Sequence, residues 1–154
     1  EDAVAGDIAW GAFRGLISGT LMMTVAMVMG VLPASVLSAV LLLALMVLIG
    51  VMFASLAMIV TSFSPSFDFF NYYTELIITP MLFFSGVFFP LDKFPPWMKT
   101  LSEFMPLTHA VKISRAVYLG VYNSGLIWSL LFIIVLETVA FTIGLKTMKR
   151  RLVK

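Results

Sequence analysis

The chain has 154 residues, of which 61% are hydrophobic and 12% are charged, and its mean hydropathy is +1.07. Soluble domains average about half apolar and about a quarter charged residues, so the composition is that of a membrane protein. The lack of cysteine excludes disulfides, thiolate metal sites and cysteine nucleophiles. A formal charge of +2, with the basic residues concentrated near one end, does not indicate nucleic-acid binding.

Four apolar stretches reach the roughly 20 residues that a membrane-spanning helix needs. The third contains Pro80, which removes one backbone donor and predicts a kink. The whole chain, residues 1–154, is therefore predicted to be one all-α transmembrane domain. Its four predicted spans lie at about residues 8–31, 36–61, 69–89 and 126–148.

The chain begins at Glu1 without an initiator methionine or a basic segment typical of a signal peptide. The simplest interpretation is that it is a segment of a longer polypeptide. The first predicted span carries only Arg14, near its start, where a long side chain can reach the headgroups. Pro33 and Ser35 predict a tight turn before the second span.

The basic tail predicts the orientation in the membrane. Five basic residues and no acidic ones lie in the tail that begins at the end of the last span, at Lys146, Lys149, Arg150, Arg151 and Lys154. Such an excess marks the cytoplasmic side. With four spans, the N-terminus and the 62–68 turn are then also cytoplasmic, and the 90–120 region faces outward.

Three glycines recur at every fourth position of the first span, at Gly11, Gly15 and Gly19, and so share one helix face. Small residues let helix backbones approach closely in lipid, where the hydrophobic effect does not drive association. The spacing fits packing within the chain first, and a dimer seam between two copies is the alternative.

The 90–120 region has two pieces too short to span. In the first, Pro95 and Pro96 fall where a helix tolerates proline, and Pro106 is predicted to end it. Its apolar residues repeat with helical spacing, at Phe94, Trp97, Met98, Leu101, Phe104 and Met105.

For the second piece, Thr108 is the predicted N-cap of a helix from about His109 to Leu119, which Gly120 closes. We therefore predict two short amphipathic helices in the outer leaflet, with Trp97 and Tyr118 as interface anchors.

Three motifs resemble a known family. They are the stretch MLFFSGVFFPLD at 81–92, the segment FPPW at 94–97 and the segment MPLTHAV at 105–111. Together they resemble the membrane subunit of type-2 ABC exporters, and within it the lipooligosaccharide branch typified by the nodulation-factor export permease. The segment SPSFDFFNYY at 64–73 is also similar to that branch.

The resemblance implies a six-span permease, of which this chain would be the C-terminal part. It implies a homodimer in the bacterial inner membrane, paired with a separate ATPase subunit that binds ATP and Mg²⁺. The substrate would be a lipid-linked or amphiphilic molecule of the lipooligosaccharide or polysaccharide type, and a drug exporter is an alternative.

Two departures from the family pattern stand out. The two upstream spans are absent, and Lys112 stands where the branch often has an acid before its arginine, here Arg115. The residues before Ile8 would end the cytoplasmic coupling segment. Its acidic side chains either contact basic residues of the ATPase or form a solvated flank, at Glu1, Asp2 and Asp7.

Catalytic signals are few. No G-x-x-x-x-G-K-[ST] loop occurs, so the chain is expected to be a transport subunit that hydrolyses no ATP by that mechanism. The single His109 cannot build a histidine metal cluster. It fits a hydrogen-bonded interface residue or a contact with a polar headgroup, whereas an intramembrane enzyme would lack a second catalytic group.

Two acids fall within predicted spans, Glu75 and Glu137. Intramembrane acids are costly and often functional. They fit pairing with Arg14 or with Thr and Tyr hydroxyls, a polar contact in the substrate path, or proton coupling. The last role would make the chain an ion- or proton-coupled transporter, the alternative to an ABC permease.

The outer region is predicted to contain the gate of the exporter. The candidate substrate path and gate residues are the two intramembrane acids together with Phe84, Phe88, Phe89, Trp97 and His109.

Overall fold

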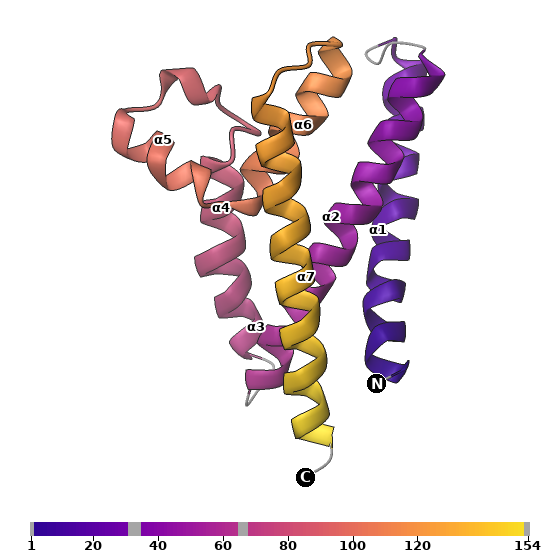
Figure 1. Cartoon of the computed structure of the whole chain (residues 1–154), viewed down its shortest axis with the longest axis vertical. Coiled ribbons are helices and arrows are strands. Elements are labelled where there is room, and N and C mark those ends of the chain that lie inside the picture. Colours follow the sequence, from indigo (N-terminus) through magenta and orange to yellow (C-terminus); the bar gives the residue numbers. More distant parts are fainter. Residues whose placement is uncertain (1, 31–34, 65–67, 153–154) are drawn as a thin grey trace.

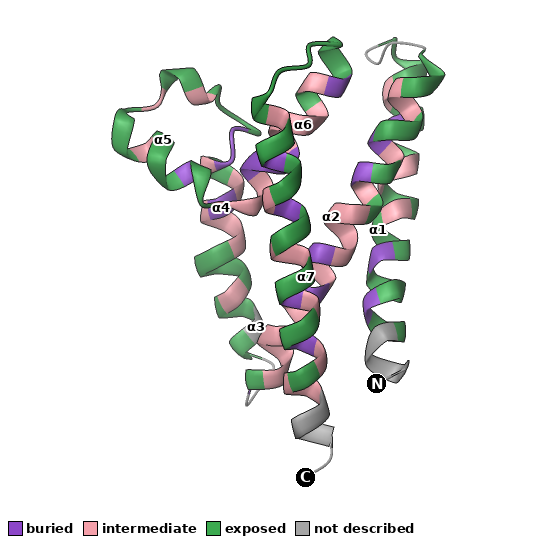
Figure 2. Ribbon diagram, in the orientation of Figure 1, coloured by how far each residue is buried: buried purple, intermediate pink, exposed green. Residues whose placement is uncertain are grey.

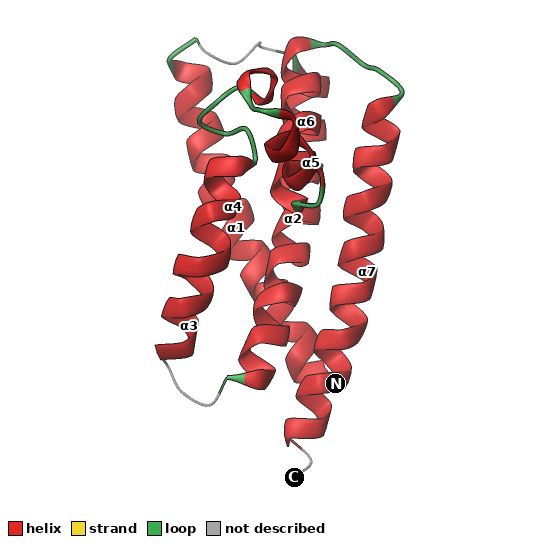
Figure 3. Cartoon of the chain, turned by 90° about the vertical axis from the view of Figure 1, so that its left-hand side faces the viewer, coloured by secondary structure: helices red, strands yellow, loops and turns green. Residues whose placement is uncertain are grey.

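The computed structural model describes residues 2–30, 35–64 and 68–152, and all the secondary structure in these ranges is helical (Figure 3). Three long helices dominate: α1 (Asp2–Val28), α2 (Val36–Phe63) and α7 (Gly125–Leu152). Each contains a stretch long and apolar enough to cross a membrane, at Gly6–Val28, Val36–Phe63 and Gly125–Met148. The first, second and fourth predicted spans are therefore confirmed as membrane-length helices.

These helices form because their backbone groups bond within the helix, and their side chains are almost all apolar. Several threonine hydroxyls inside them are satisfied locally. Thr20, Thr61 and Thr138 each donate to the carbonyl four residues earlier, at 2.7, 2.8 and 2.7 Å. The predicted turn at Pro33 lies outside the described residues.

The third predicted span is helical but shorter, and it is built from three pieces. They are α3 (Asp68–Tyr73), a π-helical turn (Thr74–Ile78) and α4 (Thr79–Phe84). Together they rise about 25 Å, somewhat less than the roughly 30 Å of a bilayer core. The helix ends at Phe84 rather than at 89, because Ser85 leads into Gly86 at φ +85°.

The predicted kink at Pro80 takes the form of the π turn just before it. A proline has no N–H and clashes with the carbonyl four residues earlier. The wider turn re-pairs the backbone, since both the N–H and the hydroxyl of Thr79 donate to the Thr74 carbonyl, the hydroxyl at 3.1 Å. Such π turns are a known way to absorb a local fault in a helix.

After a 3₁₀ turn (Leu91–Lys93), two short helices follow: α5 (Pro96–Glu103) and α6 (Pro106–Leu119). The prediction of two helices is confirmed, as is closure of the second by Gly120 at φ +68°. The predicted cap is wrong. Pro106 starts α6 in the position where a missing N–H costs nothing. Thr108 therefore lies inside the first turn, where its buried hydroxyl has no hydrogen-bond partner among the described residues.

The start of α1, the end of α2 and the end of α7 lie at one end of the bundle, and α5 and α6 lie at the other (Figure 1). α2 packs against both α1 and α7, and α6 packs against α7 and α2. Figure 2 shows that α5 is mostly exposed, whereas α6 carries buried positions.

α6 thus belongs to the helical core rather than lying flat on its outside. One cluster of fully buried side chains joins α2, α6 and α7 through Met52, Ala110 and Ile133. A second joins α1, α2 and α6 through Met23, Leu42 and Val117. After the exposed α5, the chain therefore re-enters the bundle at α6, which packs between α2 and α7.

Candidate functional site

His109 lies at the junction of α5, α6 and α7. Its Nε2 is 2.9 Å from the backbone carbonyl of Glu103, and its Nδ1 is 3.1 Å from the hydroxyl of Ser129 on α7. A carbonyl oxygen only accepts, so Nε2 carries the proton, and in the neutral ring Nδ1 accepts from the Ser129 hydroxyl. The ring also stacks on Phe132, with centroids 4.2 Å apart. The buried imidazole thus connects three segments.

Two basic side chains, three residues apart, lie on the same face of α6. Lys112 forms an ion pair with the Glu103 carboxylate, and Arg115 donates to the carbonyl of Gly86. The Gly86 carbonyl belongs to the turn that ends α4, so Arg115 ties this turn to α6. Lys112 replaces the acid that the family often has before this arginine, and Arg115 instead has a backbone carbonyl as its partner.

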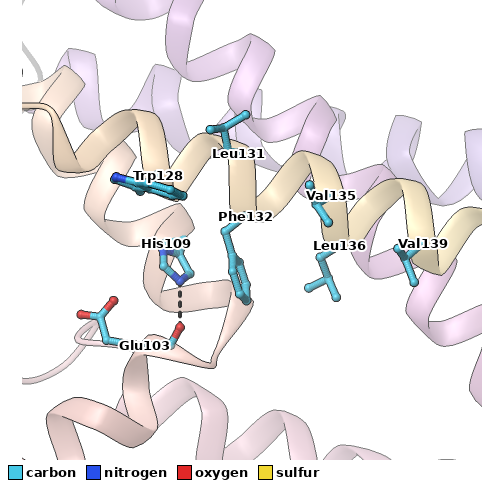
Figure 4. Close-up of a pocket in the computed structure, with 8 residues that line it drawn as sticks. All are labelled: Glu103, His109, Trp128, Leu131, Phe132, Val135, Leu136 and Val139. Atoms are coloured by element: carbon cyan, nitrogen blue, oxygen red, sulfur yellow. Dashed lines mark hydrogen bonds between the residues drawn. The ribbon is translucent and has the colours of Figure 1, made fainter.

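An apolar groove of about 470 Å³ follows α7 away from His109 (Figure 4). Figure 4 shows side chains of α7 following one another along the groove, with His109 and Glu103 at one end. The groove is lined by Glu103, His109, Trp128, Leu131, Phe132, Val135, Leu136 and Val139.

A polar cavity of about 530 Å³ adjoins this groove. The two share three lining residues: Glu103, His109 and Trp128. The polar cavity adds Lys112, Arg115, Ala116, Asn123, Gly125, Leu126 and Ser129. We call the groove and this cavity together the amphiphilic cleft. An elongated apolar groove continuing into a polar cavity is suited to a molecule with an apolar chain and a polar head.

The other predicted gate residues lie elsewhere. Phe84 is half-buried near the end of α4, whereas Phe88, Phe89 and Trp97 are exposed on the loop and on α5. The Phe88 ring contacts that of Phe83, with centroids 5.6 Å apart. None of these aromatic residues lines the amphiphilic cleft, so the structure groups only His109 with it.

The two intramembrane acids also lie apart from the cleft. Glu75 is exposed in the π turn, and Glu137 is half-buried in a separate hollow of about 310 Å³ on α7, together with Val51 and Phe141. Within the described ranges neither acid forms an ion pair with Arg14, whose side chain is exposed. The structure therefore does not join the acids in one site.

The glycine face of α1 is used partly within the chain. A Cβ at Gly11 would lie 3.1 Å from the Cβ of Ala54, and one at Gly19 would lie 2.5 Å from the sulfur of Met46, both on α2. A Cβ at Gly15 would meet nothing within 4 Å. Two of the three glycines thus lie against α2.

The acidic flank can be followed only in part. Glu1 and the side chain of Asp2 lie outside the described residues, and Asp7 is exposed in the second turn of α1. Within the described part of the chain, no group of three or more His, Asp or Glu side chains could hold a metal ion.

Sequence reasoning missed the partners of His109. Ser129 was an ordinary serine in an apolar run, and Glu103 contributes a backbone carbonyl, which no residue type announces. Trp128 and Phe132 were hidden in the hydropathy of the last span. The available signal was helical spacing, since 128, 131, 132, 135, 136 and 139 lie on one stripe of a helix.

Comparison with known proteins gives consistent matches. The family model for the ABC-2 type transporter matches residues 2–119. The chain is 38% identical over 151 residues to nodulation protein J of Sinorhizobium fredii, covering 98% of this chain and 57% of that protein. Nodulation protein J of Rhizobium leguminosarum bv. viciae is 33% identical over 153 residues, covering 99% of this chain and 58% of that protein.

A more distant relative is the inner membrane transport permease YadH of Escherichia coli, 28% identical over 124 residues, which cover 80% of this chain and 48% of the relative. No solved structure matches. The chain spans a little over half the length of the first two relatives. With a family match over more than half of its residues and three membrane-length helices, the chain belongs to the ABC-2 type transporter permeases.

Proposed function

We propose that the chain is the C-terminal part of the membrane subunit of an ATP-driven exporter for a lipid-linked or amphiphilic substrate. The observation that supports the substrate class is the exposed aromatic set of the outer region, Phe88, Phe89 and Trp97, which offers an apolar surface to an amphiphilic molecule at the exit. The export permease itself is supported by the family match and by the relative named as an inner membrane transport permease.

Four spans in a six-span subunit fit the chain best. The α3–α4 segment rises about 25 Å, and a bilayer can thin locally to accept a short helix at modest cost. The apolar residues that follow it, Phe88 and Phe89, are exposed and would extend the apolar surface toward the interface. The chain spans only 57% and 58% of the first two relatives, so a complete subunit of their length would have room for two further spans.

The energy source would be a separate ATPase subunit that binds ATP and Mg²⁺. ATP binding and hydrolysis there would shift a dimer of permeases between inward-open and outward-open states. The exposed Asp7 at the start of α1 is placed to contribute to docking of the ATPase. The basic end of α7 favours the cytoplasmic side of the bacterial inner membrane for the C-terminus, which puts the cleft in the outer leaflet.

A lipid glycan of the lipooligosaccharide type fits this arrangement. Its acyl part would follow apolar surfaces of the outer leaflet, and its glycan would meet exposed polar groups of the outer region such as Asp92 and Lys93. The exposed aromatic residues Phe88, Phe89 and Trp97 would guide the substrate at the exit. This aromatic set is the proposed outer gate.

The test is transport in vesicles that contain the complete permease and its ATPase. A fluorescent lipid-linked glycan on the ATPase side should cross only with hydrolysable ATP and should not cross when the catalytic carboxylate of the ATPase is removed. Changing the three aromatic residues of the proposed gate to Ala should reduce export and leave ATPase docking intact. Transport without nucleotide would refute the proposal.

The same vesicles test the proton-coupled alternative. If a proton gradient drove transport without ATP, and Glu75→Gln with Glu137→Gln abolished it, the chain would be an ion-coupled transporter. Glu75 is exposed in the π turn and Glu137 lies in its own hollow, so the two acids do not form one proton-binding site. This separation favours the hypothesis of an ATP-driven exporter.

A further inference from the structure

We propose that the amphiphilic cleft is a binding site for one anionic phospholipid of the surrounding membrane, retained by the permease rather than transported. An acyl chain would lie in the apolar groove of α7, and the phosphate would lie in the polar cavity beside Lys112 and Arg115. The proposal concerns a resident lipid and does not depend on the identity of the exported substrate.

The length of the groove matches one leaflet. Its lining on α7 runs from Trp128 to Val139, which is about 16 Å at 1.5 Å per residue. The hydrocarbon core of a bilayer is about 30 Å thick, so one leaflet is about half of that. A groove of this length that ends in a polar cavity has the polarity profile of a lipid lying along the helix.

Trp128 marks the boundary between the two parts, because it lines both of them. Its side chain is 75% exposed, and an exposed tryptophan at the end of a spanning helix is typical of the headgroup level. Below it, Leu131, Val135 and Val139 are each about half exposed and follow the i, i+4 spacing of one helix stripe. The groove therefore opens sideways toward lipid tails.

The charge of the polar cavity selects the headgroup. Its lining holds one acid, Glu103, and two basic residues, Lys112 and Arg115, which together leave one net positive charge. Arg115 has five N–H donors and uses one nitrogen on the Gly86 carbonyl, so further donors remain for a phosphate. Guanidinium–phosphate contacts are among the strong charge-assisted hydrogen bonds. An anionic headgroup is favoured over a zwitterionic one, which would bring its own cation to this cavity.

The experiment uses the full permease complex, purified in mild detergent and observed by native mass spectrometry. Phosphatidylglycerol and phosphatidylethanolamine with the same acyl chains are titrated against it. We expect one phosphatidylglycerol per permease to be retained, with an affinity about tenfold higher than that of phosphatidylethanolamine, as one extra charge-assisted contact would give.

Two matched pairs of variants separate the groove from the cavity. Val135→Trp fills the groove and should lower lipid affinity about tenfold. Ile134→Trp changes the neighbouring exposed residue, which does not line the cleft, and should have no effect. Lys112→Gln should lower the preference for phosphatidylglycerol, whereas Lys99→Gln, an exposed α5 lysine outside the cleft, should not.

Three results would overturn the proposal. Equal retention of both lipids, or equal loss in the two tryptophan variants, would mean that only ordinary boundary lipid binds. Release of the bound lipid on each ATP turnover, followed in the same instrument, would make it transported cargo. Lys112→Gln also keeps the test valid if Val135→Trp does not fold, since its side chain lies partly at the surface.

Discussion

Two regions of this bundle are held together by different physical means. α1, α2 and the far half of α7 are unbroken helices that approach each other at small residues, as where Gly50 faces the backbone of Ala12. The α4–α5–α6 region is interrupted by turns. There, side chains donate hydrogen bonds to backbone carbonyls at helix ends and turns. The His109 ring donates to the Glu103 carbonyl, and Arg115 donates to the Gly86 carbonyl.

These two kinds of contact differ because the surrounding solvent is lipid rather than water. Lipid gives helices no hydrophobic reason to associate, so unbroken helices rely on close packing. Interrupted backbone at membrane depth is tolerated only where protein or water satisfies its polar groups. The packed region therefore depends on shape, and the interrupted region depends on a few directed hydrogen bonds. Variants that damage one kind of contact should leave the other largely intact.

The largest effect is expected in the packed region, from Gly50→Val. Even a Cβ at Gly50 would lie 3.1 Å from the Cα of Ala12, and backbone cannot move aside cheaply. Overpacking of this kind costs about 3 kcal/mol. Denaturation in detergent should show that loss in the free energy of unfolding, together with weaker α1–α2 association.

Its control is Gly15→Val on α1, where an added Cβ meets nothing within 4 Å. This variant should change the free energy of unfolding by less than about 0.5 kcal/mol. If Gly15→Val were as damaging as Gly50→Val, close approach within the chain would not be what holds the packed region together, and the glycine face would point to a second copy.

The next effect is expected in the interrupted region, from His109→Ala. The change leaves the Ser129 hydroxyl and the Glu103 carbonyl without their partner and removes the stacking on Phe132. Leaving buried polar groups unpaired costs about 2 kcal/mol. Hydrogen exchange should speed up at amides of α5 and the start of α6, while amides of α1 and α2 keep their protection.

Ser129→Ala serves as the smaller step in the same series, because it removes one of the two bonds of the ring and keeps the carbonyl contact. Its cost should be about 1 kcal/mol. Uniform loss of protection over all helices in either variant would show that the two regions unfold together, which would contradict the comparison.

A third effect is expected at the turn that ends α4, from Gly86→Ala. Gly86 has φ +85°, and an added Cβ would lie 2.9 Å from Cγ of Leu91. Strain and contact together should cost about 1.5 kcal/mol. Gly120→Ala isolates the strain, since that residue has φ +68° but open space around it. If the two variants cost the same in thermal unfolding, the contact with Leu91 contributes nothing.

Hydropathy was enough to predict the packed region, because a spanning helix satisfies its own backbone whatever its neighbours are. It placed α2 from Val36 and α7 within a residue of its start. The hydropathy pattern predicted the wrong helix boundary where a local glycine or proline interrupted the apolar sequence. The predicted helix to residue 89 stops at Phe84, since the left-handed Gly86 ends it, and Pro106 rather than Thr108 begins α6.

For the site, the sequence identified His109 but not what it touches. Its partner Ser129 is 20 residues away, and the contact exists only because α6 packs against α7. The aromatic residues of the predicted gate lie apart from His109 for the same reason. Phe88, Phe89 and Trp97 are near in sequence to the site, yet their loop and α5 point them outward. Residue type predicted candidates, whereas tertiary packing decided which of them meet.

The smallest effect is expected from the one ion pair in the described part of the interrupted region, Lys112 with Glu103. Their side chains are 34% and 53% exposed, so solvent weakens the attraction and each long side chain loses rotamer freedom on pairing. Exposed pairs of this kind contribute about 0.5 kcal/mol or less. A double-mutant cycle with Lys112→Gln and Glu103→Gln should give a coupling energy of that size, falling further as salt is added. A coupling energy near that of the buried His109 contacts would mean that the pair, rather than the imidazole, fastens α5 to α6. The order of the two energies therefore decides which polar contact holds the interrupted region together.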